Sequence, residues 1–235
     1  MTILNIYESP VVVDRIRHAT MRVAPVSGFG FAVGCQAVPL AAVEFIEVAR
    51  EYPIVFARVQ ERLVALAVLG VRANENLFVT ADGRWEGRYV PAFLRRYPFV
   101  VIEAPGGVLS LGLDEGCPAV GAADGELLFD HDGNNTAFLE RTLSFVSQAQ
   151  DSYNATQTLL ATIEQLGVLV PMNARFAMKD GRHLEINDFL CVQEEKLLSI
   201  DAENLEKIYR TGILALMYAH LWSLGNFNRL LEKLA

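Results

Sequence analysis

Two neighbouring arginines are the residues in this chain with the clearest capacity to bind a ligand. Arg95 and Arg96 lie in a short segment that also carries aromatic side chains, with Trp85 and Tyr89 before it and Tyr97 directly after it. A guanidinium group is planar and can pair with two oxygens of a carboxylate or a phosphate at once. Flat aromatic rings can frame a pocket around such an anion. The segment therefore predicts a binding site for an anionic peptide or small molecule.

A structural role is the alternative for the same segment. In that case it is a short helix that ends at Pro98, and its arginines pair with carboxylates such as Glu44 or Glu86. Because consecutive helical residues project about 100° apart, at most one of the two guanidinium groups points into the protein. Glu44 is kept among the candidate ligand-binding residues.

His220 is a further candidate because it lies in the middle of a strongly apolar helical pattern, between Leu216 and Leu224. Two hypotheses remain open for its imidazole. It is either a core histidine that is hydrogen-bonded to a backbone group or a hydroxyl, or a ligand-binding or catalytic group inside a pocket. A single concave pocket lined by Arg95, Glu44 and His220 would favour the second hypothesis.

An acidic segment raises the question of a cation site. Residues 103–132 hold seven Asp or Glu and no Lys or Arg, and residues 130–135 place oxygen-bearing side chains at alternate positions. An EF-hand loop needs an acidic residue at its twelfth position, where this chain has Arg141, so the EF-hand is excluded. A turn whose Asp and Asn side chains accept backbone hydrogen bonds is favoured, and a looser cation site stays open. His183 and Glu185 share one strand face, but no second pair of ligands accompanies them.

The cysteines do not indicate catalysis or a cofactor. Cys35, Cys117 and Cys191 are far apart and odd in number, which argues against a disulfide framework and against a zinc cluster. None of them has a base beside it in the sequence, so none is expected to be a nucleophile. No catalytic residue, metal or other cofactor is predicted, and whether the chain is an enzyme stays open.

Composition argues against disorder and against a membrane-spanning chain. Hydrophobic residues make up 52% of the sequence and charged residues 20%, which suits a sizeable core. The apolar stretch at residues 212–226 is shorter than the roughly 20 residues of a spanning helix. The N-terminus shows no secretory signal. A soluble cytoplasmic protein is predicted, and export by a route that needs no signal stays open.

Charge is unevenly distributed along the chain. Residues 1–100 carry eleven Arg and nine Asp or Glu, whereas residues 101–235 carry nine Lys or Arg and nineteen Asp or Glu. Nucleic-acid binding depends on a basic field that displaces counterions, and the net charge of this chain is −8. The expected partners are therefore a peptide or small molecule, another protein or a second copy of the chain, and not a nucleic acid.

The first half of the chain has the pattern of an antiparallel sheet with one inserted helix. Pro39 suits the first turn of that helix and Pro53 ends it. One helix face is expected to be apolar and another acidic, through Leu40, Val43, Ile46 and Ala49 on the first and Glu44, Glu47 and Glu51 on the second. Two pairs of β-branched runs predict antiparallel strands, at residues 54–59 with 63–71 and at residues 99–102 with 108–113.

The second half changes to a helical period. Residues 135–166 predict a long amphipathic helix, and residues 168–178 and 183–192 predict a hairpin around the turn at 179–182. Asp201 opens a final helix that is apolar nearly all round between Ile213 and Leu224, so it is expected to be buried. The predicted fold class is α+β, with mainly antiparallel sheets, a long amphipathic helix and a buried C-terminal helix. One domain over residues 1–235 is expected, with two lobes, β-rich 1–130 and helical 131–235, left open.

Several motifs resemble the SapC family. They run from Gly34-Cys35-Gln36-Ala37-Val38-Pro39-Leu40 to Tyr52-Pro53-Ile54-Val55-Phe56, and from Asn76-Leu77-Phe78-Val79 through Asp82-Gly83-Arg84-Trp85 to Arg95-Arg96-Tyr97-Pro98-Phe99. Shorter matches lie at residues 128–130, 194–197 and 218–224. The similarity spans nearly the whole chain. It implies a bacterial protein associated with a paracrystalline surface layer, and it brings no established catalytic residues.

Two classes of function stay open. In the first, the chain is a non-catalytic binding or accessory protein that handles a peptide or small metabolite, or is associated with the surface layer. In the second, it is an enzyme acting on a peptide or small molecule. The resemblance implies flavin-dependent halogenases or cupin-type oxygenases as partners for such an enzyme. Because the sequence shows no clear set of catalytic residues, a binding or accessory protein is favoured.

Overall fold

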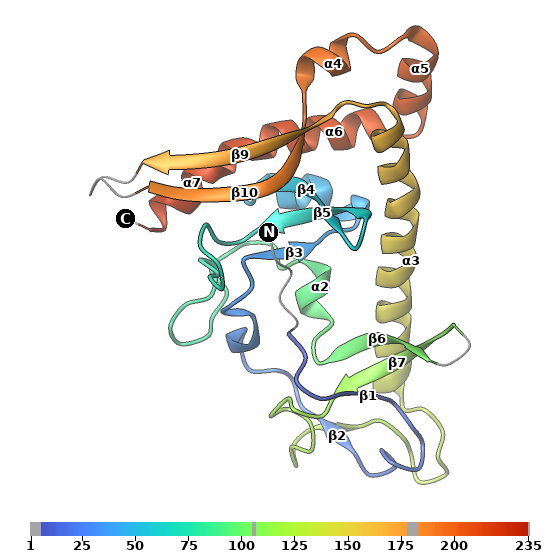
Figure 1. The fold of residues 1–235 in the computed structure, drawn as a ribbon. Helices are drawn as coiled ribbons and strands as arrows, with labels where there is room; N and C mark the ends of the chain where they lie inside the picture. Colours follow the sequence, from blue (N-terminus) through green and yellow to red (C-terminus); the bar gives the residue numbers. More distant parts are fainter. Residues whose placement is uncertain (1–5, 105–106, 178–182, 235) are drawn as a thin grey trace. The chain divides into compact units, whose positions relative to one another are not determined.

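The computed structural model describes residues 6–104, 107–177 and 183–234, and it confirms an α+β fold with antiparallel sheets (Figure 1). The chain forms two compact units. Of the described residues, the first unit contains 30–91 and 152–234, and the second contains 6–29 and 92–151. The units are thus interleaved along the sequence and do not meet at a single boundary near residue 130.

A five-stranded antiparallel sheet is the centre of the first unit. Its spatial order is β3, β5, β4, β10, β9, with bounds Ala37–Pro39, Arg62–Val68, Ile54–Val59, His183–Val192 and Leu169–Ala177. Both predicted hairpins are confirmed, and the predicted turn at residues 179–182 lies outside the described residues. Strand β3 was not predicted. Pro39 ends this edge strand instead of opening a helix, and an edge position tolerates its missing N–H.

The inserted helix of the first unit is present, but its predicted faces are confirmed only for Leu40, which is buried, and Glu47, which is exposed. It consists of a 3₁₀ turn, Ala42–Glu44, and α1, Phe45–Ala49. Val43 and Ile46 are 76% and 63% exposed, whereas the side chains of Glu44 and Glu51 are buried. The 3₁₀ turn shifts the angular positions of the first residues, and the two carboxylates are buried because backbone N–H groups satisfy them.

Several short helices form the C-terminal part of the first unit. They are α4 (Glu194–Leu198), α5 (Ala202–Arg210), α6 (Ile213–Ser223), a 3₁₀ turn (Leu224–Asn226) and α7 (Phe227–Glu232). The final helix predicted from Asp201 is divided at Gly212, which has a positive φ of 76° and separates α5 from α6. Helix α6 packs on β4 and β10 (Figure 1). This helix was expected to be buried on all sides, but only one of its faces is buried. Trp222, for example, is 78% exposed.

The second unit combines small antiparallel sheets with a helix. Its strands are β1 (Pro10–Val12), β7 (Val108–Asp114) and β6 (Phe99–Ala104) in one sheet, and β2 (Arg22–Val23) with β8 (Glu126–Leu127) in another. The short helix α2 spans Ala92–Arg95. A buried cluster joins the sheets to the first turns of α3, through Phe99, Leu113, Leu128, Leu139 and Val146.

Helix α3, Ala137–Gln165, is the predicted long helix. Its residues up to 151 belong to the second unit and the rest to the first. No helix among the described residues is long and apolar enough to span a membrane.

Candidate functional site

The predicted arginines line a pocket of about 290 Å³ that lies entirely within the second unit. We call it the arginine pocket. Its polar rim includes Arg95, Arg96 and Arg141. Its walls are largely apolar or aromatic, from Val23, Pro25, Val26, Tyr97, Phe99, Phe138, Phe145 and Val146.

The start of strand β6 positions the two neighbouring arginines. Helix α2 ends at Arg95, and backbone hydrogen bonds from Tyr97 N to Leu94 O (3.2 Å) and from Phe99 N to Arg96 O (2.7 Å) continue the turn. Phe99 then pairs with Leu113 in the sheet. The arginine backbone is therefore anchored to a regular strand.

The two guanidinium groups have different surroundings, as expected for neighbours about 100° apart. Arg95 is exposed, and its guanidinium carbon lies 5.4 Å from the centre of the Phe145 ring. Arg96 is half-buried, with its guanidinium carbon 4.7 Å from the centre of the Phe93 ring. The Nε of Arg96 also donates a hydrogen bond to the Tyr7 hydroxyl at 3.0 Å. Arg96 is thus oriented by both a ring contact and a hydrogen bond.

Tyr7 links Arg96 to the sheet. Its hydroxyl accepts from Arg96 and donates to the carbonyl of Phe99 at 3.2 Å. Burial raises the pKa of Tyr7, although the charge of Arg96 acts in the opposite direction. The phenol is therefore neutral, and one edge of the guanidinium remains fixed.

The charge of the arginine pocket is opposite to that of its unit. The second unit contains six Lys or Arg and eleven Asp or Glu, yet three of the six basic residues line this pocket. No Asp or Glu among the described residues is part of the lining. Arg141 lies 3.4 Å from Glu126, with both side chains exposed. Three cations without a carboxylate in the wall make a local positive field that attracts an anion.

Three other predicted site residues lie together in the first unit. The Glu44 carboxylate accepts hydrogen bonds from the Tyr89 hydroxyl at 2.9 Å and from the backbone N of Ala41 at 3.1 Å. Trp85 Nε1 donates to the carbonyl of Tyr89 at 3.2 Å. These hydrogen bonds connect the 85–91 segment to the turn before α1. Arg95 and Arg96 belong to the other unit.

Glu51 completes this network and was not recognised in the sequence as a buried residue. One oxygen of its carboxylate accepts from the backbone N of Arg88 at 2.6 Å and of Tyr89 at 3.0 Å. The other oxygen lies 3.2 Å from the guanidinium of Arg229. A buried carboxylate that accepts hydrogen bonds through both of its oxygens stabilises the fold. Nothing near Glu51 in the sequence indicates its burial, because the groups that bind its carboxylate come from residues 88, 89 and 229.

His220 bridges two strands of the first unit. Its Nδ1 lies 2.8 Å from the carbonyl of Ile54 in β4, and its Nε2 accepts from the backbone N of Val192 in β10 at 3.1 Å. The side chain is fully buried, and burial lowers the pKa of His220 to about 4. Ser223 accepts from the backbone N of Ile54 at 2.8 Å. The imidazole is therefore neutral at physiological pH, and both of its nitrogens contact backbone groups.

The cysteines are buried, and the acidic turn at residues 130–135 makes the hydrogen bonds of a turn. Burial raises the pKa of Cys35 to about 11 and of Cys191 to about 12, which suits protonated core residues. Asp130, His131 and Asp132 offer ligand atoms within 4.8 Å of one another. However, one oxygen of Asp130 already accepts from the backbone N of Asp132 and of Asn134, at 2.9 and 2.8 Å. This is the turn geometry favoured from the sequence.

Comparison with known proteins identifies the family. A family model described as SapC matches residues 13–230, which cover nearly all of both units. The chain belongs to the SapC family. The match includes Arg95, Arg96, Arg141 and the other residues of the arginine pocket. No curated protein and no solved structure matches this SapC-family chain.

Proposed function

We propose that this SapC-family protein is a binding or accessory protein that holds a peptide or small metabolite by its carboxylate in the arginine pocket. The observation that carries this proposal is the gathering of Arg95, Arg96 and Arg141 around an apolar wall within an acidic unit. A carboxylate suits the guanidinium fork, and an attached aromatic or aliphatic group suits the phenylalanines.

Arg96 is the main anchor in this proposal. Tyr7 and Phe93 hold its guanidinium in place, so little side-chain freedom is lost when an anion binds. Arg95 and Arg141 are more exposed and contribute chiefly through their charge.

A matched pair of ligands tests the proposal. N-acetylphenylalanine carries a carboxylate and an aromatic ring, and N-acetylphenylalaninamide has the same shape without the charge. Titration calorimetry should detect tighter binding of the acid. Replacing Arg96 with Ala should weaken that binding roughly 10- to 100-fold, as expected for a lost charge-assisted hydrogen bond. Arg96→Lys should retain only part of the affinity, because it keeps the charge and loses the fork.

Arg15→Ala is the control variant, because Arg15 is an exposed arginine of the same unit outside the arginine pocket. It should bind the acid like the parent. Thermal melts of each variant separate lost binding from lost folding. Equal binding of the acid and the amide, or parent-like affinity in a folded Arg96→Ala variant, would overturn the proposal.

A further inference from the structure

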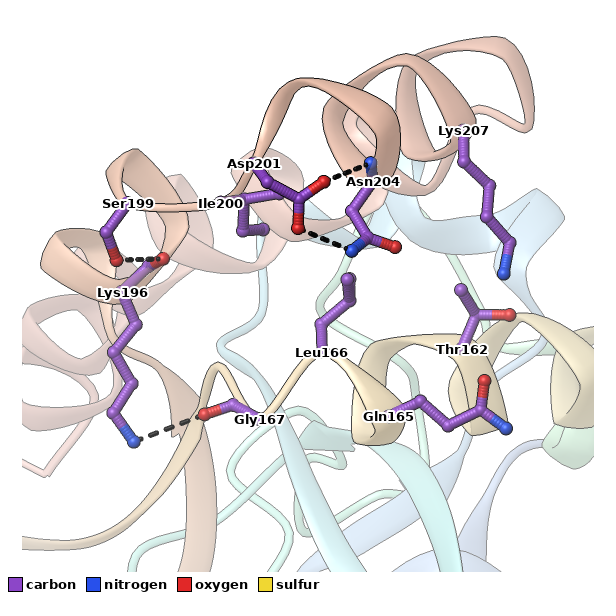
Figure 2. Close-up of a pocket in the computed structure, with 10 residues that line it drawn as sticks. All are labelled: Thr162, Gln165, Leu166, Gly167, Lys196, Ser199, Ile200, Asp201, Asn204 and Lys207. Carbon is purple, nitrogen blue, oxygen red and sulfur yellow. Dashed lines mark hydrogen bonds between the residues drawn. The ribbon is translucent and has the colours of Figure 1, made fainter.

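A second, polar groove lies in the first unit, where the C-terminal end of α3 faces α4, α5 and the residues between them (Figure 2). We call it the lysine groove. It has a volume of about 360 Å³. Leu166 and Ile200 form an apolar part of its lining, and the polar lining comes from Thr162, Gln165, Lys196, Ser199, Asp201, Asn204 and Lys207. Figure 2 shows Lys196 and Lys207 on opposite sides of it.

The acidic residue of the groove is already satisfied. One oxygen of Asp201 accepts from the backbone N of Asn204 at 2.9 Å, and the other accepts from the Asn204 side-chain amide at 2.7 Å. These bonds lower the pKa of Asp201 and cap the first turn of α5. Asp201 therefore does not neutralise the lysines by direct contact.

The two lysines differ in what holds them. The Lys196 ammonium donates one hydrogen bond, to the carbonyl of Gly167 at 3.2 Å, and keeps two further hydrogens. For the Lys207 ammonium, no hydrogen bond or ion pair is found within the described part of the chain, although Glu203 precedes it by one helical turn. The next acidic residue, Glu206, pairs instead with Arg210 at 2.7 Å.

Gln165, on α3, adds an uncharged donor to the groove. Within residues 6–104, 107–177 and 183–234, its side-chain amide makes no hydrogen bond. Figure 2 shows Gln165 at the same end of the groove as Lys207, on the facing helix. An ammonium and an amide N–H together suit a carboxylate, which accepts through both oxygens. Lys196, across the apolar residues Leu166 and Ile200, offers a second cation for a second carboxylate.

We propose that the lysine groove binds a ligand with two carboxylates joined by a short aliphatic chain. One carboxylate contacts Lys207 and Gln165, the other contacts Lys196, and the chain packs over Leu166 and Ile200. A free dicarboxylic acid and a pair of acidic side chains on a peptide share this chemistry. The site is independent of the arginine pocket, because its lining lies in the other unit.

Chemical-shift titration of the ¹⁵N-labelled protein tests this proposal, with glutarate as the dicarboxylate and butyrate as the monocarboxylate of similar length. Glutarate should shift amide signals of residues 162–167 and 196–207 and should bind about fivefold more tightly than butyrate. A peptide with two glutamates and blocked ends forms a second arm. Tighter binding of either the peptide or glutarate identifies the source of the carboxylates.

Lys207→Gln and Lys196→Gln should each weaken glutarate binding about fivefold. Arg210→Gln removes a positive charge from the same helix outside the groove, and it should bind like the parent. Lys207 is exposed and unpaired within the described residues, so its substitution should leave the fold unchanged. Parent-like binding by Lys207→Gln, equal binding of butyrate, or shifts that map outside the groove would overturn the inference.

Discussion

Lowering the pH from about 8 to about 5 should weaken the first unit through one buried side chain, His220. Its imidazole joins the Ile54 carbonyl to the Val192 backbone N, and the second of these contacts needs an unprotonated Nε2. Burial lowers the pKa of His220 from 6.5 to about 4. The unfolded chain therefore takes up a proton at higher pH than the folded chain, and acid favours unfolding.

The size of this effect follows from the pKa difference. One pKa unit corresponds to about 1.4 kcal/mol, so the shift of His220 amounts to about 3 kcal/mol of unfolding free energy. This contribution is complete above pH 6.5 and declines as the pH falls toward the folded-state pKa of about 4. By about pH 5, roughly 2 kcal/mol of it should be lost.

Urea unfolding followed by tryptophan fluorescence measures the relevant unit. The chain has two tryptophans, Trp85 and Trp222, and both belong to the first unit. His220→Gln should be less stable than the parent at about pH 8, because buried backbone groups lose partners at roughly 1–3 kcal/mol. Between about pH 8 and about pH 5, the variant should lose roughly 2 kcal/mol less than the parent.

His131→Gln is the control, because the His131 side chain is 89% exposed, and its pH dependence should match that of the parent. Acidic residues and the other histidines are common to the parent and to His220→Gln, so their contributions cancel in the difference. If the parent and His220→Gln change equally between the two pH values, then His220 is not held neutral by burial and the reasoning is refuted.

Two further predictions concern the packing of the first unit. Gly87→Ala should lower the unfolding free energy by roughly 1–3 kcal/mol, because the new Cβ would lie 2.1 Å from the Tyr52 hydroxyl; Gly30→Ala, with no heavy atom within 4 Å of its Cβ, should melt near the parent. Thr156→Val should cost roughly 1–3 kcal/mol in urea unfolding, because the Ala42 backbone N loses its bond to the Thr156 hydroxyl, whereas Thr156→Ser should retain most of the stability. A parent-like Gly87→Ala or Thr156→Val would contradict these assignments.

The long elements could be predicted because their periods extend over many residues. Helix α3 and the hairpins β4–β5 and β6–β7 each repeat one pattern long enough to fix the type of element. Helix α1 is too short to show such a repeat, and the apolar spacing in this region placed Val43 and Ile46 on the buried face. Val43 and Ile46 are exposed, because the buried face is determined by what Glu44 contacts far along the chain, at Tyr89.

The clustering of arginines and aromatic residues in the sequence predicted part of the arginine pocket. Arg95, Arg96 and Tyr97 do line one pocket, but Phe138 and Phe145 come from α3 and could not be identified without the fold. Trp85 and Tyr89 are close to the arginines in sequence, yet the boundary between the units falls between residues 91 and 92. Trp85 donates to the carbonyl of Tyr89, and Tyr89 donates to Glu44 and Glu51, all within the first unit. A ligand at Arg96 therefore depends on the second unit for its contacts, and substitutions in the Glu51 network test stability separately from binding.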